Sequence, residues 1–147
     1  MKRKVYAKEE VCMGCHLCEV YCAVQHSKTK DVWKAYKLEP EKPVPRLIVE
    51  ENKPVSFALQ CRHCEDAPCV EACLTGAMHK EDGVVVCDSD RCVGCWTCIM
   101  VCPYGAIRRA DLQGKKLIFK CDFCQGSETP ACVAHCPNEA LVLVEEE

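Results

Sequence analysis

The sequence has few of the large apolar residues that normally build a core. Leu, Ile, Val and Phe together number 33 among 147 residues, close to the level at which a chain struggles to form an apolar interior. No run of about 18 apolar residues occurs, so we expect no transmembrane segment. Something other than hydrocarbon must therefore hold the fold together.

An export signal and a nucleotide-binding loop are also missing. The first ten residues, MKRKVYAKEE, contain no apolar stretch of the kind that signal peptides need. We therefore expect a cytoplasmic protein whose thiols stay reduced. A glycine-rich phosphate loop is absent, which removes the simplest route to nucleotide chemistry.

Cysteine is what the chain has in excess, with 17 residues. Sixteen of them form four groups of four, and Cys87 is left over. Tight groups and an odd count disfavour a disulfide framework. The first and third groups share the spacing C-x2-C-x2-C-x3-C, whereas the middle gap grows to four residues in the second group and seven in the fourth. The groups are Cys12, Cys15, Cys18 and Cys22; Cys61, Cys64, Cys69 and Cys73; Cys92, Cys95, Cys98 and Cys102; and Cys121, Cys124, Cys132 and Cys136.

The C-x2-C-x2-C spacing favours 4Fe-4S clusters over zinc. It brings three thiolates to one point, and in bacterial two-cluster ferredoxins the fourth cysteine ligates the other cluster. A structural zinc site instead takes two ligands from each of two knuckles, so a third cysteine at this spacing would be idle. Zinc stays an alternative for the two stretched groups taken alone. Bound clusters would add negative charge to a net charge of -3, which argues against nucleic acid as a partner.

Short strands and turns are predicted between the cysteine groups. Asp82-Gly83 and Gln113-Gly114 are typical of turns between antiparallel strands. The predicted strands are Arg46 to Glu50, Val55 to Leu59, Gly83 to Cys87, Ala106 to Arg109, Leu117 to Lys120 and Ala140 to Val144. We expect an α+β fold of short helices and small antiparallel hairpins around the clusters.

Over most of its length the chain resembles the four-cluster iron-sulfur subunits of molybdenum and tungsten oxidoreductases. This family includes small ferredoxin-like subunits that serve formate dehydrogenases, hydrogenases and carbon monoxide dehydrogenases. The resemblance runs from Glu9 to about Val144, without the C-terminal extension or membrane anchor of the larger members. The phrases that carry it are Cys12-Met-Gly-Cys-His-Leu-Cys18, Cys61-Arg-His-Cys-Glu-Asp-Ala-Pro-Cys69, Cys92-Val-Gly-Cys-Trp-Thr-Cys98 and Cys121-Asp-Phe-Cys124.

The resemblance implies a single domain over 1–147, made of two nested bacterial-ferredoxin-like halves. The outer half would comprise 1–26 plus 104–147, the inner half 55–103, and 27–54 would be an insertion. The motifs would pair one with four and two with three, giving four 4Fe-4S clusters. Their ligand sets would be Cys12, Cys15, Cys18 and Cys136; Cys121, Cys124, Cys132 and Cys22; Cys61, Cys64, Cys69 and Cys102; and Cys92, Cys95, Cys98 and Cys73.

Residues near the motifs have plainer interpretations. Cys87 is expected to be a small buried apolar residue. His16, His63 and His135 lie inside motifs that already hold four sulfurs, so we expect outer hydrogen bonds or exposed positions for them, and His26 and His79 carry no signal. The flanking aromatic residues should exclude water from the clusters; they are Tyr21, Trp96, Tyr104 and Phe123.

The function that these features predict is electron transfer without a substrate site. Four clusters would pass single electrons between a catalytic subunit (a formate, aldehyde or carbon monoxide oxidoreductase, or a hydrogenase) and a second reductase or carrier, within a hetero-oligomer. The alternatives are a freely diffusing polyferredoxin shuttle, a zinc-binding interaction module and a metal-storage polypeptide. Residues 27–54 suit either a solvated excursion or an interface, since Trp33, Tyr36, Leu38 and Leu47 lie among their charges.

Overall fold

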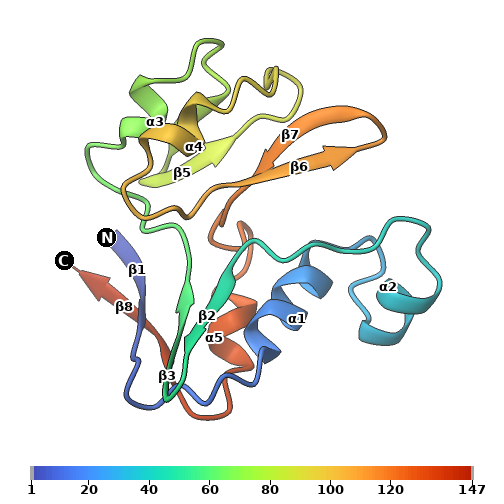
Figure 1. Ribbon diagram of the computed structural model, residues 1–147, viewed down its shortest axis with the longest axis vertical. Helices are drawn as coiled ribbons and strands as arrows, with labels where there is room; N and C mark the ends of the chain where they lie inside the picture. Colours follow the sequence, from blue (N-terminus) through green and yellow to red (C-terminus); the bar gives the residue numbers. More distant parts are fainter. Residues whose placement is uncertain (1, 147) are drawn as a thin grey trace. The chain divides into compact units, whose positions relative to one another are not determined.

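A computed structural model describes residues 2–146 as short helices joined by two-stranded antiparallel hairpins (Figure 1). The α+β class expected from the sequence is confirmed. In chain order the elements are β1 (Lys2–Ala7), α1 (Leu17–Gln25), α2 (Val32–Lys37), β2 (Ile48–Asn52), β3 (Val55–Leu59), α3 (Pro68–Glu71), β4 (Met78–Glu81), β5 (Val84–Cys87), α4 (Thr97–Val101), β6 (Arg108–Leu112), β7 (Lys115–Phe119), α5 (Ala131–Ala134) and β8 (Leu141–Glu146). None of these helices is both long and apolar enough to cross a bilayer.

The chain forms two units, which are described separately. The first unit contains the residues up to Leu59 and those from Cys124 onward, and the second contains Gln60 to Phe123. Residues 104–123, which the sequence assigned to an outer half, thus group with the second unit. The physical reason is that the hairpin β6–β7 supplies Ile118 to the second unit's core.

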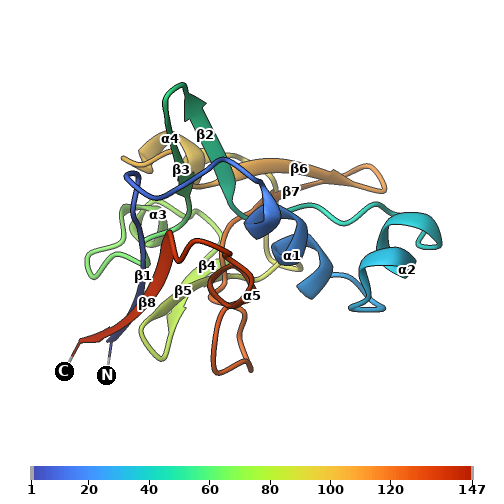
Figure 2. The same cartoon turned by 90° about the horizontal axis from the view of Figure 1, so that it is seen from below.

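The first unit is assembled from both ends of the chain. Strand β1 pairs with β8, in a register that runs from Lys2 opposite Glu146 to Ala7 opposite Leu141, and Figure 2 shows the two strands side by side with both ends of the chain at one end of the pair. Strands β2 and β3 form a hairpin, and α1 contacts α5. The core between these elements mixes cysteines with aliphatic residues and consists of Cys18, Cys22, Leu47, Val49, Ala58, Cys132 and Leu141.

The second unit is a continuous stretch of chain with two hairpins, β4–β5 and β6–β7. Both turns have consecutive positive φ angles, 49° and 81° at Asp82-Gly83 and 52° and 78° at Gln113-Gly114, as two-residue hairpin turns of type I′ require. The predicted turns are therefore confirmed. The second core consists of Ala67, Cys69, Met78, Val85, Cys98, Ile107 and Ile118.

The insertion is only partly a solvent-exposed excursion. Asp31 caps α2 by accepting a hydrogen bond from the Lys34 backbone N–H, and Trp33 stays 69% exposed. Leu47, by contrast, is 2% exposed and belongs to the first core. The interpretation of Leu47 as an interface residue is therefore wrong, because the chain returns from the insertion into the core before β2 begins.

Candidate functional site

Each cysteine motif places its third cysteine at the second position of a short helix. These four cysteines are all buried, and the helices that carry them begin beside small loops that hold the first two cysteines of the motif. The four are Cys18 in α1, Cys69 in α3, Cys98 in α4 and Cys132 in α5. One structural device is thus repeated four times along the chain.

The loops of the first and third motifs have the same backbone conformation. Gly14 and Gly94 have φ angles of 65° and 69°, and the residues that cap the following helices, His16 and Trp96, both have φ of 60°. A left-handed conformation is rare for residues with a side chain as large as Trp. It turns each loop so that three cysteines surround one space.

In the first unit, this space is a cavity that we call the first-unit cavity. It encloses about 410 Å³, part of it open to solvent, and its surface is almost wholly apolar. Its lining includes four cysteines from two distant motifs: Cys12, Cys15, Cys18 and Cys136. The fourth motif thus supplies one sulfur to the loop of the first.

The second unit contains an equivalent cavity, which we call the second-unit cavity. It encloses about 320 Å³, again partly open to solvent. Three cysteines of the third motif and one of the second line it: Cys92, Cys95, Cys98 and Cys73. Ile118 and Trp96 add apolar surface, which excludes water and favours a metal-sulfur group over hydrated ions.

Backbone N–H groups donate hydrogen bonds to the sulfur of the fourth cysteine in three of the motifs. The Met78 N–H donates to Cys73 Sγ at 3.4 Å, and the Ala140 N–H donates to Cys136 Sγ at 3.2 Å. In the first unit the Arg46 N–H donates to Cys22 Sγ at 3.3 Å. Such donors stabilise thiolates and set the potentials of iron-sulfur clusters.

Burial makes the cysteine cages unfavourable for bare thiolates. It raises the pKa of Cys18 to about 12 and that of Cys98 to about 11, and the neighbouring thiols of each motif add to the rise. These sulfurs keep their protons unless metal cations take the place of the protons. The donor set, four cysteines around an apolar cavity, therefore fits a 4Fe-4S cluster in each unit.

The second motif forms a further sulfur group within the second unit. Burial raises the pKa of the Cys69 thiol, and the charges of Cys61 and Cys102 add to that rise. Lys120 is 3% exposed, and its ammonium group donates to the carbonyl oxygens of Val85 and Cys121. A buried cation requires nearby negative charge, which an anionic cluster would supply.

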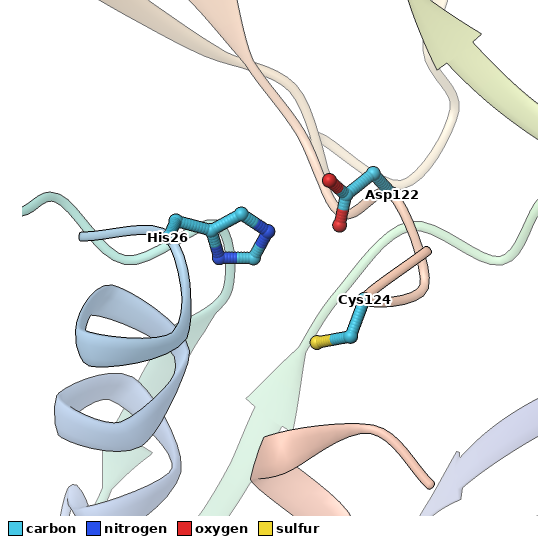
Figure 3. Close-up of side chains that lie close together, drawn as sticks. All are labelled: His26, Asp122 and Cys124. Carbon is cyan, nitrogen blue, oxygen red and sulfur yellow. The ribbon is translucent and has the colours of Figure 1, made fainter. Parts of the chain in front are cut away.

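The cysteines of the fourth motif are divided between the units. Cys121 belongs to the second unit and Cys124 to the first, where Cys22 and Cys132 share the core. His26, which carried no signal in the sequence, lies near the sulfurs of Cys22 and Cys124. One of its ring nitrogens lies within 4.8 Å of Cys124 Sγ (Figure 3), and its Nδ1 lies 3.9 Å from Cys22 Sγ.

Two buried N–H groups have no acceptor among residues 2–146. One is Trp96 Nε1 and the other is His63 Nε2. His63 Nδ1 accepts the Val85 N–H at 3.1 Å, which leaves the proton on Nε2. An unsatisfied buried donor costs about 1–3 kcal/mol, so both groups fit a structure whose missing acceptors are cluster sulfurs.

The other motif histidines bond to protein groups. His16 lies 2.9 Å from a carboxylate oxygen of Glu19 and 2.9 Å from one of Glu51, and these hydrogen bonds raise its pKa. His135 stacks on Tyr21 with ring centroids 3.7 Å apart.

Cys87 differs from its expected role as a simple core residue. It is only half-buried, and it lines the second-unit cavity together with four cysteines of the motifs. Strand pairing brings it there, since Cys87 lies opposite Met78 in the β4–β5 register. The signal in the sequence was the turn at Asp82-Gly83, which pairs the strand of Cys87 with the segment that follows Cys73.

Comparisons with known proteins agree with this geometry. Residues 53–146 match the family model of a 4Fe-4S dicluster domain. The chain is 39% identical to the electron transport protein HydN of Escherichia coli K12, over 99% of this chain and 89% of the relative. It is 33% identical to formate hydrogenlyase subunit 2 of the same organism, over 99% and 83%.

A solved structure gives the same picture of the fold. The active-site complex BamBC of benzoyl coenzyme A reductase, in complex with benzoyl-CoA, aligns over 97% of this chain and 79% of that chain, with a TM-score of 0.50 and 21% identity.

Proposed function

This chain belongs to the family of 4Fe-4S dicluster electron-transport proteins, and on that premise we propose that it moves electrons through four clusters between a catalytic redox subunit and a second carrier. Electron transport through 4Fe-4S clusters is the activity of the family. The number of clusters, their ligands and the partners are the proposal.

Four clusters follow from the cysteine count. The family match over residues 53–146 includes the second, third and fourth motifs. The first motif lies outside that match and adds a fourth complete group. Sixteen motif cysteines supply four ligands to each of four clusters.

The ligand sets rest on one observation, the composition of the two cavities. Each is lined by three cysteines of one motif and a single cysteine of another, Cys136 in the first-unit cavity and Cys73 in the second-unit cavity. Reciprocal exchange then assigns Cys22 to the cluster of the fourth motif and Cys102 to that of the second. The two further sets are therefore Cys121, Cys124, Cys132 and Cys22, and Cys61, Cys64, Cys69 and Cys102.

Residues of the chain determine how these clusters are ligated, hydrogen-bonded and exposed to solvent. When bound, a fully cysteine-ligated cluster accepts or gives one electron and has no open position for a substrate. The backbone donors to Cys73 and Cys136 stabilise the sulfurs. The exposed cysteines Cys15 and Cys95 bring one edge of each cavity to the surface, where an electron can enter or leave.

We infer that the catalytic partner is a subunit of an oxidoreductase complex, such as a formate, aldehyde or carbon monoxide oxidoreductase or a hydrogenase. The relative formate hydrogenlyase subunit 2 is by name part of such a complex. A cytoplasmic setting suits the arrangement, because the cages need reduced cysteines. A freely diffusing shuttle is the alternative in which no partner co-purifies.

The decisive experiment is metal analysis of anaerobically purified protein. We expect about sixteen iron and about sixteen acid-labile sulfide per chain, with a broad visible absorption that dithionite bleaches. About eight iron per chain would leave two of the four cluster sites empty and would contradict the count of four. Colourless protein containing zinc would overturn the function itself.

A further inference from the structure

Trp96 has an indole N–H that nothing in the described chain accepts. The group is buried, and an indole nitrogen can only donate a hydrogen bond. Buried donors in native proteins nearly always have a partner. The missing acceptor must therefore be something that the protein binds.

The position of Trp96 identifies that acceptor. Trp96 lines the second-unit cavity and lies between Cys95 and Cys98 in the chain. Its left-handed backbone, with φ of 60°, caps α4 without a side-chain hydrogen bond. Non-glycine residues keep this conformation where the surroundings impose it, often at functional sites. The acceptors that the proposed function brings into this cavity are thiolate and sulfide sulfurs.

Two cations lie over the ring of the same tryptophan. Arg109 Cζ is 4.6 Å from the ring centroid and Lys116 Nζ is 5.4 Å from it. Both residues come from the hairpin β6–β7. Positive charge close to a cluster favours the reduced form, which carries one more negative charge.

The equivalent position in the first motif has the opposite electrostatic surroundings. His16 has the same φ of 60° and caps α1 in the same way. Its ring, however, bonds to the carboxylates of Glu19 and Glu51. The two loops thus share a backbone but differ in what surrounds the capping side chain: two cations lie over Trp96, whereas two carboxylates contact His16.

We propose that Trp96 tunes the cluster of the second-unit cavity by donating its indole N–H to a cluster sulfur, and that this donor together with Arg109 and Lys116 makes that cluster easier to reduce than the cluster of the first-unit cavity. The proposal rests on the ligand sets of the proposed function. Of these two clusters, the one in the second-unit cavity is then reduced first.

The test compares Trp96→Phe with the wild type in redox titrations of the complete holoprotein, monitored by electron paramagnetic resonance. We expect one of the four one-electron steps to move to more negative potential. At the wild-type midpoint, the ratio of reduced to oxidised cluster should fall about tenfold, which corresponds to about 59 mV. The matched control is Trp33→Phe, which removes the other indole from an exposed site and should move no step.

A second measurement separates the hydrogen bond from a packing change. Transfer to D2O should shift the Fe–S stretching bands of the wild type in resonance Raman spectra, and this shift should be smaller in Trp96→Phe. Arg109→Gln should lower the potential of the same reduction step but leave the D2O shift of the Fe–S stretching bands unchanged. If Trp96→Phe loses iron, replacement of Trp96 by benzothienylalanine keeps the ring shape without the N–H.

The outcomes distinguish this proposal from the proposed function. Full iron content with four unchanged steps, in Trp96→Phe or in the benzothienylalanine protein, overturns the role of Trp96 and leaves the electron carrier intact. Wild-type protein without four reducible clusters overturns the proposed function first, and with it the basis for this inference.

Discussion

At the scale of single residues, the fourth cysteine of two motifs lines a cavity formed by another motif. Cys73 is the last cysteine of the second motif but lines the cavity of the third. Cys136 does the same for the first motif. A serine at either position should therefore damage a cluster whose other ligands lie far away in the sequence.

Trp96 offers a direct probe of this exchange. In a Trp33→Phe background it is the only tryptophan, and a cluster in the second-unit cavity should quench its fluorescence. We expect Cys73→Ser to lose about four of about sixteen iron atoms and to restore Trp96 emission. Cys102→Ser should lose as much iron but restore far less emission. The reverse result would mean that each motif closes its own cluster.

At the scale of elements, hairpin β6–β7 supports the loop of the third motif. An added Cβ at Gly94 would lie 2.5 Å from Lys116 Cβ and 2.8 Å from the Lys116 carbonyl oxygen. The loop therefore lies directly against β7, and only glycine allows this approach.

Gly94→Ala should consequently weaken the second-unit cavity. The positive φ alone costs a non-glycine residue about 1–2 kcal/mol, and the clash with the Lys116 backbone adds to it. Gly105→Ala is the matched control, because Gly105 also has a positive φ but no atom within 4 Å of its added Cβ. Anaerobic loss of visible absorbance in denaturant should be faster for Gly94→Ala than for Gly105→Ala. Equal rates would contradict the close support by β7.

Local sequence patterns predicted the elements that have local partners. Strand β3 was predicted with the observed bounds, and the turns at Asp82-Gly83 and Gln113-Gly114 were predicted because their residue types adopt positive φ. Strand β1 was missed, since Lys2–Ala7 is mostly charged and its partner lies at the other end of the chain. Strand β4 was implied by the turn at Asp82-Gly83 but received no bounds, because its four residues, MHKE, have no β-branched member.

The same limit applies to the candidate site. Cysteine spacing predicted the four motifs because the loops are local. The cations over Trp96 and the position of Cys87 beside the cavity depend on hairpins β6–β7 and β4–β5, whose packing against the loops has no signature in the spacing. Aromatic residues near cysteines were expected to exclude water, and nothing in the sequence distinguished the buried donor of Trp96 from the others.

At the scale of the whole molecule, the insertion (residues 27–54) is a long segment of the first unit that contains no cysteine. Helix α2 exposes Trp33, and Leu38 at its end is also 69% exposed. In Figures 1 and 2, α2 lies on the side of the first unit away from the ends of the chain. Apolar side chains among charges suit a contact with a partner protein.

Deletion of residues 30–43 should therefore weaken co-purification with the catalytic subunit and leave the iron content unchanged. The deletion spares Leu47 and Val49, which the first core needs. The double variant Trp33→Asp and Leu38→Asp should have the same effect without shortening the chain, whereas Lys53→Asp should have little. Complete retention of the complex in both altered proteins would remove the insertion from the interface.

The pairing of β1 with β8 has a consequence for biosynthesis. Residues 60–123 contain all the cysteines that line the second-unit cavity, so these cysteines are already in the nascent chain before Cys136 is added. The first-unit cavity lacks its fourth motif cysteine until Cys136 is translated. If clusters are inserted during translation, the second-unit cavity would thus have its motif cysteines in the chain before the first-unit cavity does, and we expect its cluster to be inserted first.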